Sequence, residues 1–302
     1  MFEEFYKKIK QENISDQNLL MLSDLDFGEL RISIKDWQSL SSKLRQEIVI
    51  RVSEMAEESV DLDFTSILRL ALDDPESEIK ESAIAGLWES EERKLIPKLC
   101  DMLRKDSELS VRVAAAINLG HFALMSVTGK LLDKDGERIY TPLIDALSDE
   151  NESIELRRRA LESISVFQTD DVTNWILWAY REVSDQLKQS SVFSMGKSCN
   201  PIWIPTIVEE LNSEDPAMRY EAAIAAGEQM AESTVPILIA MLADTDIEVR
   251  SAVIQSLGII GGSSAKKALQ ALLESEDDFT REIVQESLKV ADLDQSGMDM
   301  RP

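Results

Sequence analysis

The chain has 302 residues, of which 57 are acidic and 32 are basic, so its net charge at pH 7 is -25. This acidic field disfavours binding to nucleic acid phosphates and to the anionic cytoplasmic face of a membrane. Because the sequence has one histidine and two cysteines, its composition also argues against most zinc sites and against most Ser-His-Asp or Cys-His catalytic sets.

Residues 1–61 contain one helical stripe of apolar residues, spaced to share one face of an α-helix. The stripe consists of Leu44, Ile48, Val49, Val52 and Met55. We expect the segment to be a helical cap that covers the apolar face of the repeats that follow. The start, MFEEFYKKIKQ, lacks the apolar core of a signal peptide, and no run approaches the roughly 20 apolar residues that cross a bilayer. We therefore expect a cytoplasmic protein.

Residues 62–291 carry a repeat that is marked by a basic residue. The bases are Lys80, Arg112, Arg157, Lys188, Arg219, Arg250 and Arg281, and from Arg157 onward they are 31 residues apart. Residues one before, three after and seven after each base are almost all apolar or small, as on one face of an inner helix. Glycine stands eight residues after four of the bases, at positions 120, 196, 227 and 258, where we expect the inner helix to end in a left-handed cap.

An outer helix is expected before each inner helix. Its first turn is marked by proline, a residue favoured there, in four repeats: Pro97, Pro142, Pro205 and Pro236. Between the two helices lies an acidic turn, with an acid four residues before the base in five repeats: Glu76, Glu108, Asp215, Asp246 and Asp277. These acids should favour the start of the inner helix, and they could pair with bases of the next repeat to form a ladder.

Two stretches depart from the period. Fourteen extra residues before Arg157 fall within about 121–139, which indicates either a loop on a binding face or a tolerated insertion. The repeat around Lys188 is rich in aromatic residues, Trp178 among them, and either packs an atypical core or forms a binding hot spot. Residues 292–302 are expected to be a flexible tail.

Two segments, WIPTIVEELNSEDPAMRYEAAIAAGEQM (203–230) and TVPILIAMLADTDIEVRSAVIQSLGIIGG (234–262), resemble HEAT repeats. The period is similar to that of the short bacterial type also found in phycobilin lyases. The resemblance implies an all-α solenoid without β-sheet, a right-handed superhelix of antiparallel helix pairs, with about seven pairs over residues 62–291. It is specific for the fold and says little about function.

Some HEAT-repeat proteins are di-iron hydroxylases that act on deoxyhypusine, and their metal ligands are repeated His-Glu pairs. Here the single histidine, His121, is followed by Phe122, so the ligand set is missing. We expect no catalytic residue, metal site or cofactor.

In such a solenoid the inner helices line a concave surface. Positions one and five after each base form a stripe along the inner helices. The side-chain types at these positions vary from repeat to repeat, while the core positions stay apolar, which is typical of a recognition surface. The candidate partner-binding residues are Arg158, Glu162, Gln189, Phe193, Tyr220 and Ile224, together with Trp178. Alternatively, Ile117, Phe193 and Ile224 fill the seam between neighbouring inner helices.

The sequence favours a non-enzymatic scaffold or adaptor that binds another protein or peptide, and the acidic charge favours a basic segment of that partner. Three alternatives remain open: a phycobilin-lyase-like or chaperone-like maturation factor, an enzyme with an unrecognised carboxylate site, and a self-assembling structural protein. The sequence does not determine the oligomeric state.

Overall fold

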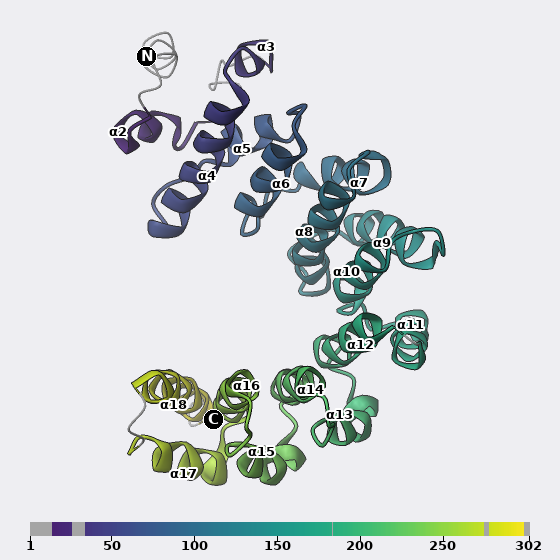
Figure 1. Cartoon of the computed structure of the whole chain (residues 1–302), viewed down its shortest axis with the longest axis vertical. Helices are drawn as coiled ribbons and strands as arrows, with labels where there is room; N and C mark the ends of the chain where they lie inside the picture. The colour runs from purple at the N-terminus through teal and green to yellow at the C-terminus, as the bar shows by residue number, and fades with distance from the viewer. Residues whose placement is uncertain (1–13, 26–33, 183, 275–277, 299–302) are drawn as a thin grey trace. The chain divides into compact units, whose positions relative to one another are not determined.

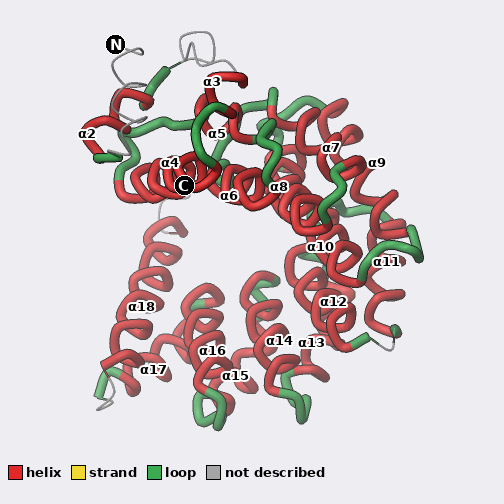
Figure 2. Tube along the Cα trace, turned by 45° about the horizontal axis from the view of Figure 1, so that its top comes forward, coloured by secondary structure: helices red, strands yellow, loops and turns green. Residues whose placement is uncertain are grey.

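A computed structural model of the chain describes residues 14–25, 34–182, 184–274 and 278–298. It shows helices joined by short turns, with no strand in these ranges, which confirms the predicted all-α repeat architecture (Figure 2). The chain divides into two compact units, Met1–Ser163 and Ile164–Pro302, within the stretch predicted as one solenoid. The handedness of the superhelix stays a prediction.

The helices of the first unit are α2 (Asp16–Leu19), η1 (Leu20–Leu22), α3 (Ile34–Gln38), α4 (Ser42–Glu58), α5 (Thr65–Ala71), α6 (Ser77–Gly86), α7 (Leu95–Lys105), α8 (Leu109–Val127), α9 (Asp133–Ser148) and α10 (Ile154–Ile164). Those of the second unit are α11 (Asp170–Arg181), α12 (Asp185–Lys197), η2 (Pro201–Trp203), α13 (Ile204–Glu210), α14 (Pro216–Glu228), η3 (Glu232–Thr234), α15 (Val235–Met241), α16 (Ile247–Ile260), α17 (Gly262–Leu272) and α18 (Asp278–Met298).

Each repeat pairs an outer helix with an inner helix. In the second unit α12, α14, α16 and α18 form the inner layer, and α11, α13, α15 and α17 form the outer layer (Figure 1). In the first unit α4, α6, α8 and α10 are the inner helices, with α5, α7 and α9 outside them. Every repeating base is the fourth residue of its inner helix, and Arg45 holds the same place in α4. The cap therefore repeats the inner-helix pattern.

The core follows the predicted spacing. In α16, for example, Val249 and Val253, one before and three after the base, are fully buried. Outer helices contribute Leu99, Ile207 and Leu238, which are also fully buried. Each repeat removes this apolar face from water by packing it against the neighbouring repeats.

The repeated glycines do not end the inner helices, so that expectation was wrong. Gly120, Gly196, Gly227 and Gly258 lie inside α8, α12, α14 and α16. The left-handed residues that follow α12 and α14 are Cys199 and Met230, each with φ of 47°. The glycines instead allow the next inner helix to approach, since a Cβ on Gly196 would lie 2.7 Å from the Cα of Ala225.

The extra residues within 121–139 are mostly helical, and only residues 128–132 form a turn between α8 and α9. They lengthen α8 to 19 residues and move the start of α9 back to Asp133, so Pro142 lies inside that helix. The added turn of α8 packs, because Phe122, Ala123 and Met125 are buried.

By length and composition, α8 is the one helix of the described ranges that could span a membrane. Its most apolar stretch is 44% buried, and the helix packs against α6, α7 and α9. Core helices have the same composition, and α8 is one of them here.

The described part of the predicted cap contains packed helices, since the whole α4 stripe is buried. Trp37, 1% exposed, donates its indole N–H to Asp74 at 2.5 Å, and the Arg45 guanidinium contacts the same carboxylate at 2.7 Å. These two bonds tie the cap to the first repeat. At the other end, α18 continues to Met298, so residues 292–298 are helical, and residues 299–302 lie outside the described part.

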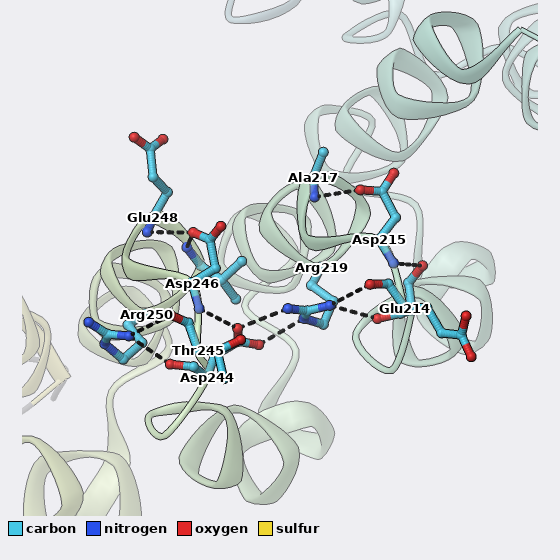
Figure 3. A network of polar contacts seen from close by, with 11 residues as sticks. Glu214, Asp215, Ala217, Arg219, Asp244, Thr245, Asp246, Glu248 and Arg250 are labelled. Atoms are coloured by element: carbon cyan, nitrogen blue, oxygen red, sulfur yellow. Dashed lines mark hydrogen bonds and ion pairs between the residues drawn. The ribbon is translucent and has the colours of Figure 1, made fainter.

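The expected ladder of ion pairs exists, but its acids lie mainly six residues before the bases, not four. Arg219 donates from Nε and Nη2 to the two carboxylate oxygens of Asp244 in the next repeat, at 2.7 and 2.9 Å (Figure 3). Asp244 also accepts the backbone N–H of Asp246 at 2.9 Å. The corresponding pairs are Arg45–Asp74, Lys80–Asp106, Arg112–Glu152 and Lys188–Glu210. Asp74 and Asp106 also accept a backbone N–H of their own turn, so these two acids and Asp244 each fix a turn and bind the preceding repeat.

The acids four residues before the bases are not the ladder acids, and two of them cap the start of the inner helix. Asp215 accepts the backbone N–H of Ala217 at 3.0 Å, and Asp246 accepts that of Glu248 at 2.8 Å (Figure 3). These bonds satisfy helix N–H groups that have no partner within the helix. Glu76 and Glu108 hold the same position without such a bond, and Asp277 lies outside the described residues.

Candidate functional site

The predicted site residues fall in both units. Arg158 and Glu162 lie on α10 in the first unit; Trp178 on α11, Gln189 and Phe193 on α12, and Tyr220 and Ile224 on α14 belong to the second.

On α10 the charges neutralise one another. The Arg158 guanidinium contacts Glu155 at 2.5 Å and Glu162 at 3.3 Å, and Arg159 contacts the same two carboxylates at 3.0 and 2.9 Å. Burial raises the pKa of Glu155, but hydrogen bonds from both arginines hold it below its ordinary value. Arg158 is thus part of a neutral network on its own helix, and not a free cation for a partner.

In the second unit, α12 and α14 bring together the apolar centre of the predicted site. Phe193, Tyr220 and Ile224 are half-buried on these adjacent inner helices, and Gln189 lies one turn before Phe193. They fill part of the seam and still offer surface. Ile117, the third residue of the seam-filling alternative, is 50% exposed and does not fill it.

The polar groups around this centre are mostly acidic. Burial raises the pKa of Tyr220, and the carboxylates of Glu221 and Glu248 raise it further, so its phenol stays a hydrogen-bond donor at neutral pH. The ammonium group of Lys197 lies 5.8 Å from the centroid of the Phe193 ring. The same ammonium group is paired with Glu228 at 2.7 Å. The surface therefore offers an aromatic, hydrogen-bonding centre in a negative surrounding.

Trp178 does not share that surface. It lies on the outer helix α11, with its ring edge-on to Trp175 at 5.3 Å between centroids. Tyr180, also on α11, donates to Glu210 of α13 at 2.5 Å, and Lys188 lies 2.9 Å from the same carboxylate. Tyr180 therefore links its repeat to the next one, and of the aromatic residues in this repeat Phe193 is the one on the inner stripe.

Trp88 and Leu124, two exposed apolar side chains of the first unit, were missed by the sequence analysis. They are 54% and 50% exposed. Trp88 lines a cleft of about 940 Å³ beside α4, α5 and α6. A signal existed, because Trp88 stands eight residues after Lys80, where four other repeats have glycine.

Within the described ranges, no three His, Cys, Asp and Glu side chains converge to hold a metal ion. His121 is half-buried, and burial lowers its pKa. Its Nε2 atom makes no hydrogen bond in the described structure. Cys100 and Cys199 are free thiols, and burial raises the pKa of Cys100 to about 11.

Comparison with known proteins identifies the repeats. Residues 204–289, from α13 to α18, match a family model described as HEAT repeats, and residues 95–125, covering α7 and most of α8, match a HEAT repeat. Deoxyhypusine hydroxylase of Candida albicans is 26% identical over 129 residues, which are 42% of this chain and 41% of that protein. The chain thus matches about two fifths of the length of this curated relative.

Solved structures share the fold at low identity. The complex of CpcE and CpcF of phycocyanin lyase from Nostoc sp. PCC7120 has a TM-score of 0.55 at 15% identity, over 89% of this chain and 94% of that chain. YibA of Escherichia coli has a TM-score of 0.43 at 16% identity, over 96% of both chains. The helix pairs and the two family matches together show that the chain contains HEAT repeats, at residues 95–125 and 204–289.

Proposed function

We propose that this HEAT-repeat protein is a non-enzymatic scaffold that binds a protein or peptide partner along the inner helices of its second unit. The observation that carries the proposal is the half-exposed group of Phe193, Tyr220 and Ile224 on α12 and α14. Aromatic side chains held rigidly at the centre of a surface are typical of binding hot spots. Because Arg158 is neutralised on its own helix, its expected contribution is small.

The partner segment that suits this surface is basic. Glu221 and Glu248 lie near Tyr220, and exposed Glu282 and Glu286 follow on α18. A negative rim speeds the encounter with a positive partner and makes the binding sensitive to salt. The chain's net charge of -25 acts in the same direction.

The test is affinity capture from native lysate with the full chain, at low and moderate salt, with captured proteins identified by mass. The double variant Phe193→Ala and Tyr220→Ala should lose the dominant partner, and added salt should weaken capture by the unaltered protein. Ile202→Ala, which truncates an apolar side chain that is 56% exposed elsewhere in the same unit, is the matched control. A folded double variant that captures the same partner as before would overturn the assignment.

A maturation factor resembling the phycobilin lyases is the second candidate. Its support is the shared repeat fold with the CpcE and CpcF complex, which is a likeness of fold alone. If the purified protein retains a pigment and shifts its absorption spectrum, the maturation factor becomes the better assignment and the scaffold proposal is wrong. We also propose that the protein is cytoplasmic. The two free thiols support this location, because thiols stay reduced in the cytoplasm.

A further inference from the structure

The cleft in the first unit is large enough to receive several side chains. Its volume is about 940 Å³, at the upper end of the roughly 300–1,000 Å³ that is usual for ligand sites. Its walls come from the C-terminal end of α4, the chain around the start of α5, and the turn after α6.

The cleft exists because α6 is short. It has 10 residues, whereas α14 has 13 and α16 has 14. At its last residue, Gly86, it lies close to α4, since a Cβ there would be 2.1 Å from the Oγ of Ser53. Where longer inner helices continue, the chain here turns away through Trp88 and leaves the cleft open.

The lining is strongly acidic. Its carboxylates are those of Asp24, Glu57, Asp63, Glu89, Glu91 and Glu92, and its cations are those of Arg69 and Lys94. Both cations already face Glu92, Arg69 at 2.8 Å and Lys94 at 3.8 Å.

Two of these carboxylates are available to a ligand. Glu91 is paired with Lys130 at 2.5 Å, and the bond holds the pKa of Glu91 below its ordinary value. Asp24 and Asp63 accept hydrogen bonds from Ser23 and Thr65, whereas Glu57 and Glu89 have neither an ion pair nor a hydrogen bond to their side chains among the described residues. An anionic ligand would therefore be repelled, while a cation would find unpaired carboxylates on two sides of the cleft.

One wall of the cleft is apolar and aromatic. The Trp88 side chain is 54% exposed and Val60 is fully exposed. An arginine side chain matches this combination, because its planar guanidinium stacks on an indole and pairs with carboxylates at the same time.

We propose that this cleft binds an arginine-containing segment of a partner protein, with the guanidinium over Trp88 and paired with Glu57 or Glu89. The inference rests on the proposed function, because it assumes that the scaffold takes a protein partner. It adds a second contact, on a different unit from the first.

The test uses the full chain and a short fluorescent peptide, Gly-Arg-Arg-Gly, with matched peptides that carry lysine or glutamate in place of arginine. Fluorescence anisotropy should show the order arginine, then lysine, with no binding of the glutamate peptide. Trp88→Ala should weaken binding of the arginine peptide about tenfold, within the range of cation–π contributions, and Trp88→Phe should retain most of the affinity. Equal binding of the glutamate peptide, or no effect of Trp88→Ala, would overturn the inference.

The carboxylates are tested by the double variant Glu57→Gln and Glu89→Gln. Both side chains are exposed, so the fold should be preserved, and binding should weaken and lose part of its salt dependence. Glu232→Gln, an exposed acid of the second unit, is the matched control. Self-association of the chain that Trp88→Ala abolishes would instead assign the cleft to a second copy of this protein.

The two proposals fail separately. If Trp88→Ala leaves lysate capture intact while Phe193→Ala with Tyr220→Ala abolishes it, the proposed function stands and the cleft inference is wrong. If the arginine peptide binds in a Trp88-dependent way but no protein partner is captured, the cleft recognises arginine, whereas the scaffold proposal and the assignment of a partner protein to the cleft are both wrong.

Discussion

Replacing Gly196 with alanine should destabilise the second unit, although the same change in an isolated helix would stabilise it. Alanine is favoured over glycine inside a helix by about 1 kcal/mol. In this structure the new Cβ would lie 2.7 Å from the Cα and 3.0 Å from the Cβ of Ala225. Because the nearest atom belongs to the backbone of α14, that helix must shift as a whole.

Overpacking a tight contact costs about 1–3 kcal/mol, occasionally more. Because the nearest atom is backbone and cannot rotate away, we take the upper part of this range, about 2–3 kcal/mol. After subtraction of the helix-propensity gain of about 1 kcal/mol, we expect a net loss of about 1–2 kcal/mol, which lowers Tm by about 3–8 °C. The measurement is unfolding by denaturant and by heat, followed by circular dichroism.

The control separates helix propensity from packing. Gln255 is exposed inside α16, so Gln255→Ala should be more stable than Gln255→Gly by about 1 kcal/mol. If the control pair behaves in this way and Gly196→Ala is as stable as the unaltered protein, then α12 and α14 are not packed at the distance described.

Three further outcomes follow from the ladder and the thiols. Arg219→Ala leaves the nearly buried carboxylate of Asp244 unpaired, so it should lower the free energy of unfolding by about 2–4 kcal/mol, measured with denaturant. Lys105→Ala breaks an exposed pair and should lower it by about 0–0.5 kcal/mol. Equal losses would show that the ladder pair stabilises the fold no more than a surface pair does. The Arg219 hydrogen bond holds the pKa of Asp244 below 3.8, so the pair's stabilisation is complete above that pH and is lost as the pH falls through the lower pKa of the folded state. Unfolding free energy should therefore decline below about pH 4, and Asp244→Asn should flatten the decline; an unchanged profile in this variant would contradict the assignment. A thiol-specific reagent should modify exposed Cys199 in the native protein and buried Cys100 only after denaturation; modification of both thiols in the native state would contradict the burial of Cys100.

The repeat architecture could be predicted from the sequence because a base and three apolar positions recur together. The acids of the ladder could not, because a recurrent acid near a helix start has two possible tasks. Spacing alone does not separate Asp246, which caps the helix, from Asp244, which pairs with the preceding repeat. Spacing also does not show whether a recurrent glycine ends a helix or allows close packing. The left-handed residues after α12 and α14 are Cys199 and Met230, and these residue types seldom take that conformation.

The candidate surface was predicted in part. The phase of the helix placed Phe193, Tyr220 and Ile224 on adjacent inner helices. Composition alone suggested Trp178, which belongs to the outer layer. Arg158 was expected to be available, and its pairing within α10 depends on side-chain geometry. Trp88 was missed although it holds the repeat position of the glycines, because the period does not show that α6 ends at Gly86 and leaves this side chain in an exposed turn.

The two ends of the helix pairs differ in how much change in length they tolerate. The turns that carry the ion-pair ladder are fixed, and the turns at the other end vary in length. The ion pairs lie mainly at the turns that lead from outer to inner helix, so the repeats that they join keep their register at that edge. At the opposite edge, α8 and α9 take up the extra residues within 121–139, and α6 stops early. New segments, such as a reporter or a graft that recognises a chosen target, should therefore be tolerated at the turn 128–132, whereas insertion at Asp244 should uncouple two repeats.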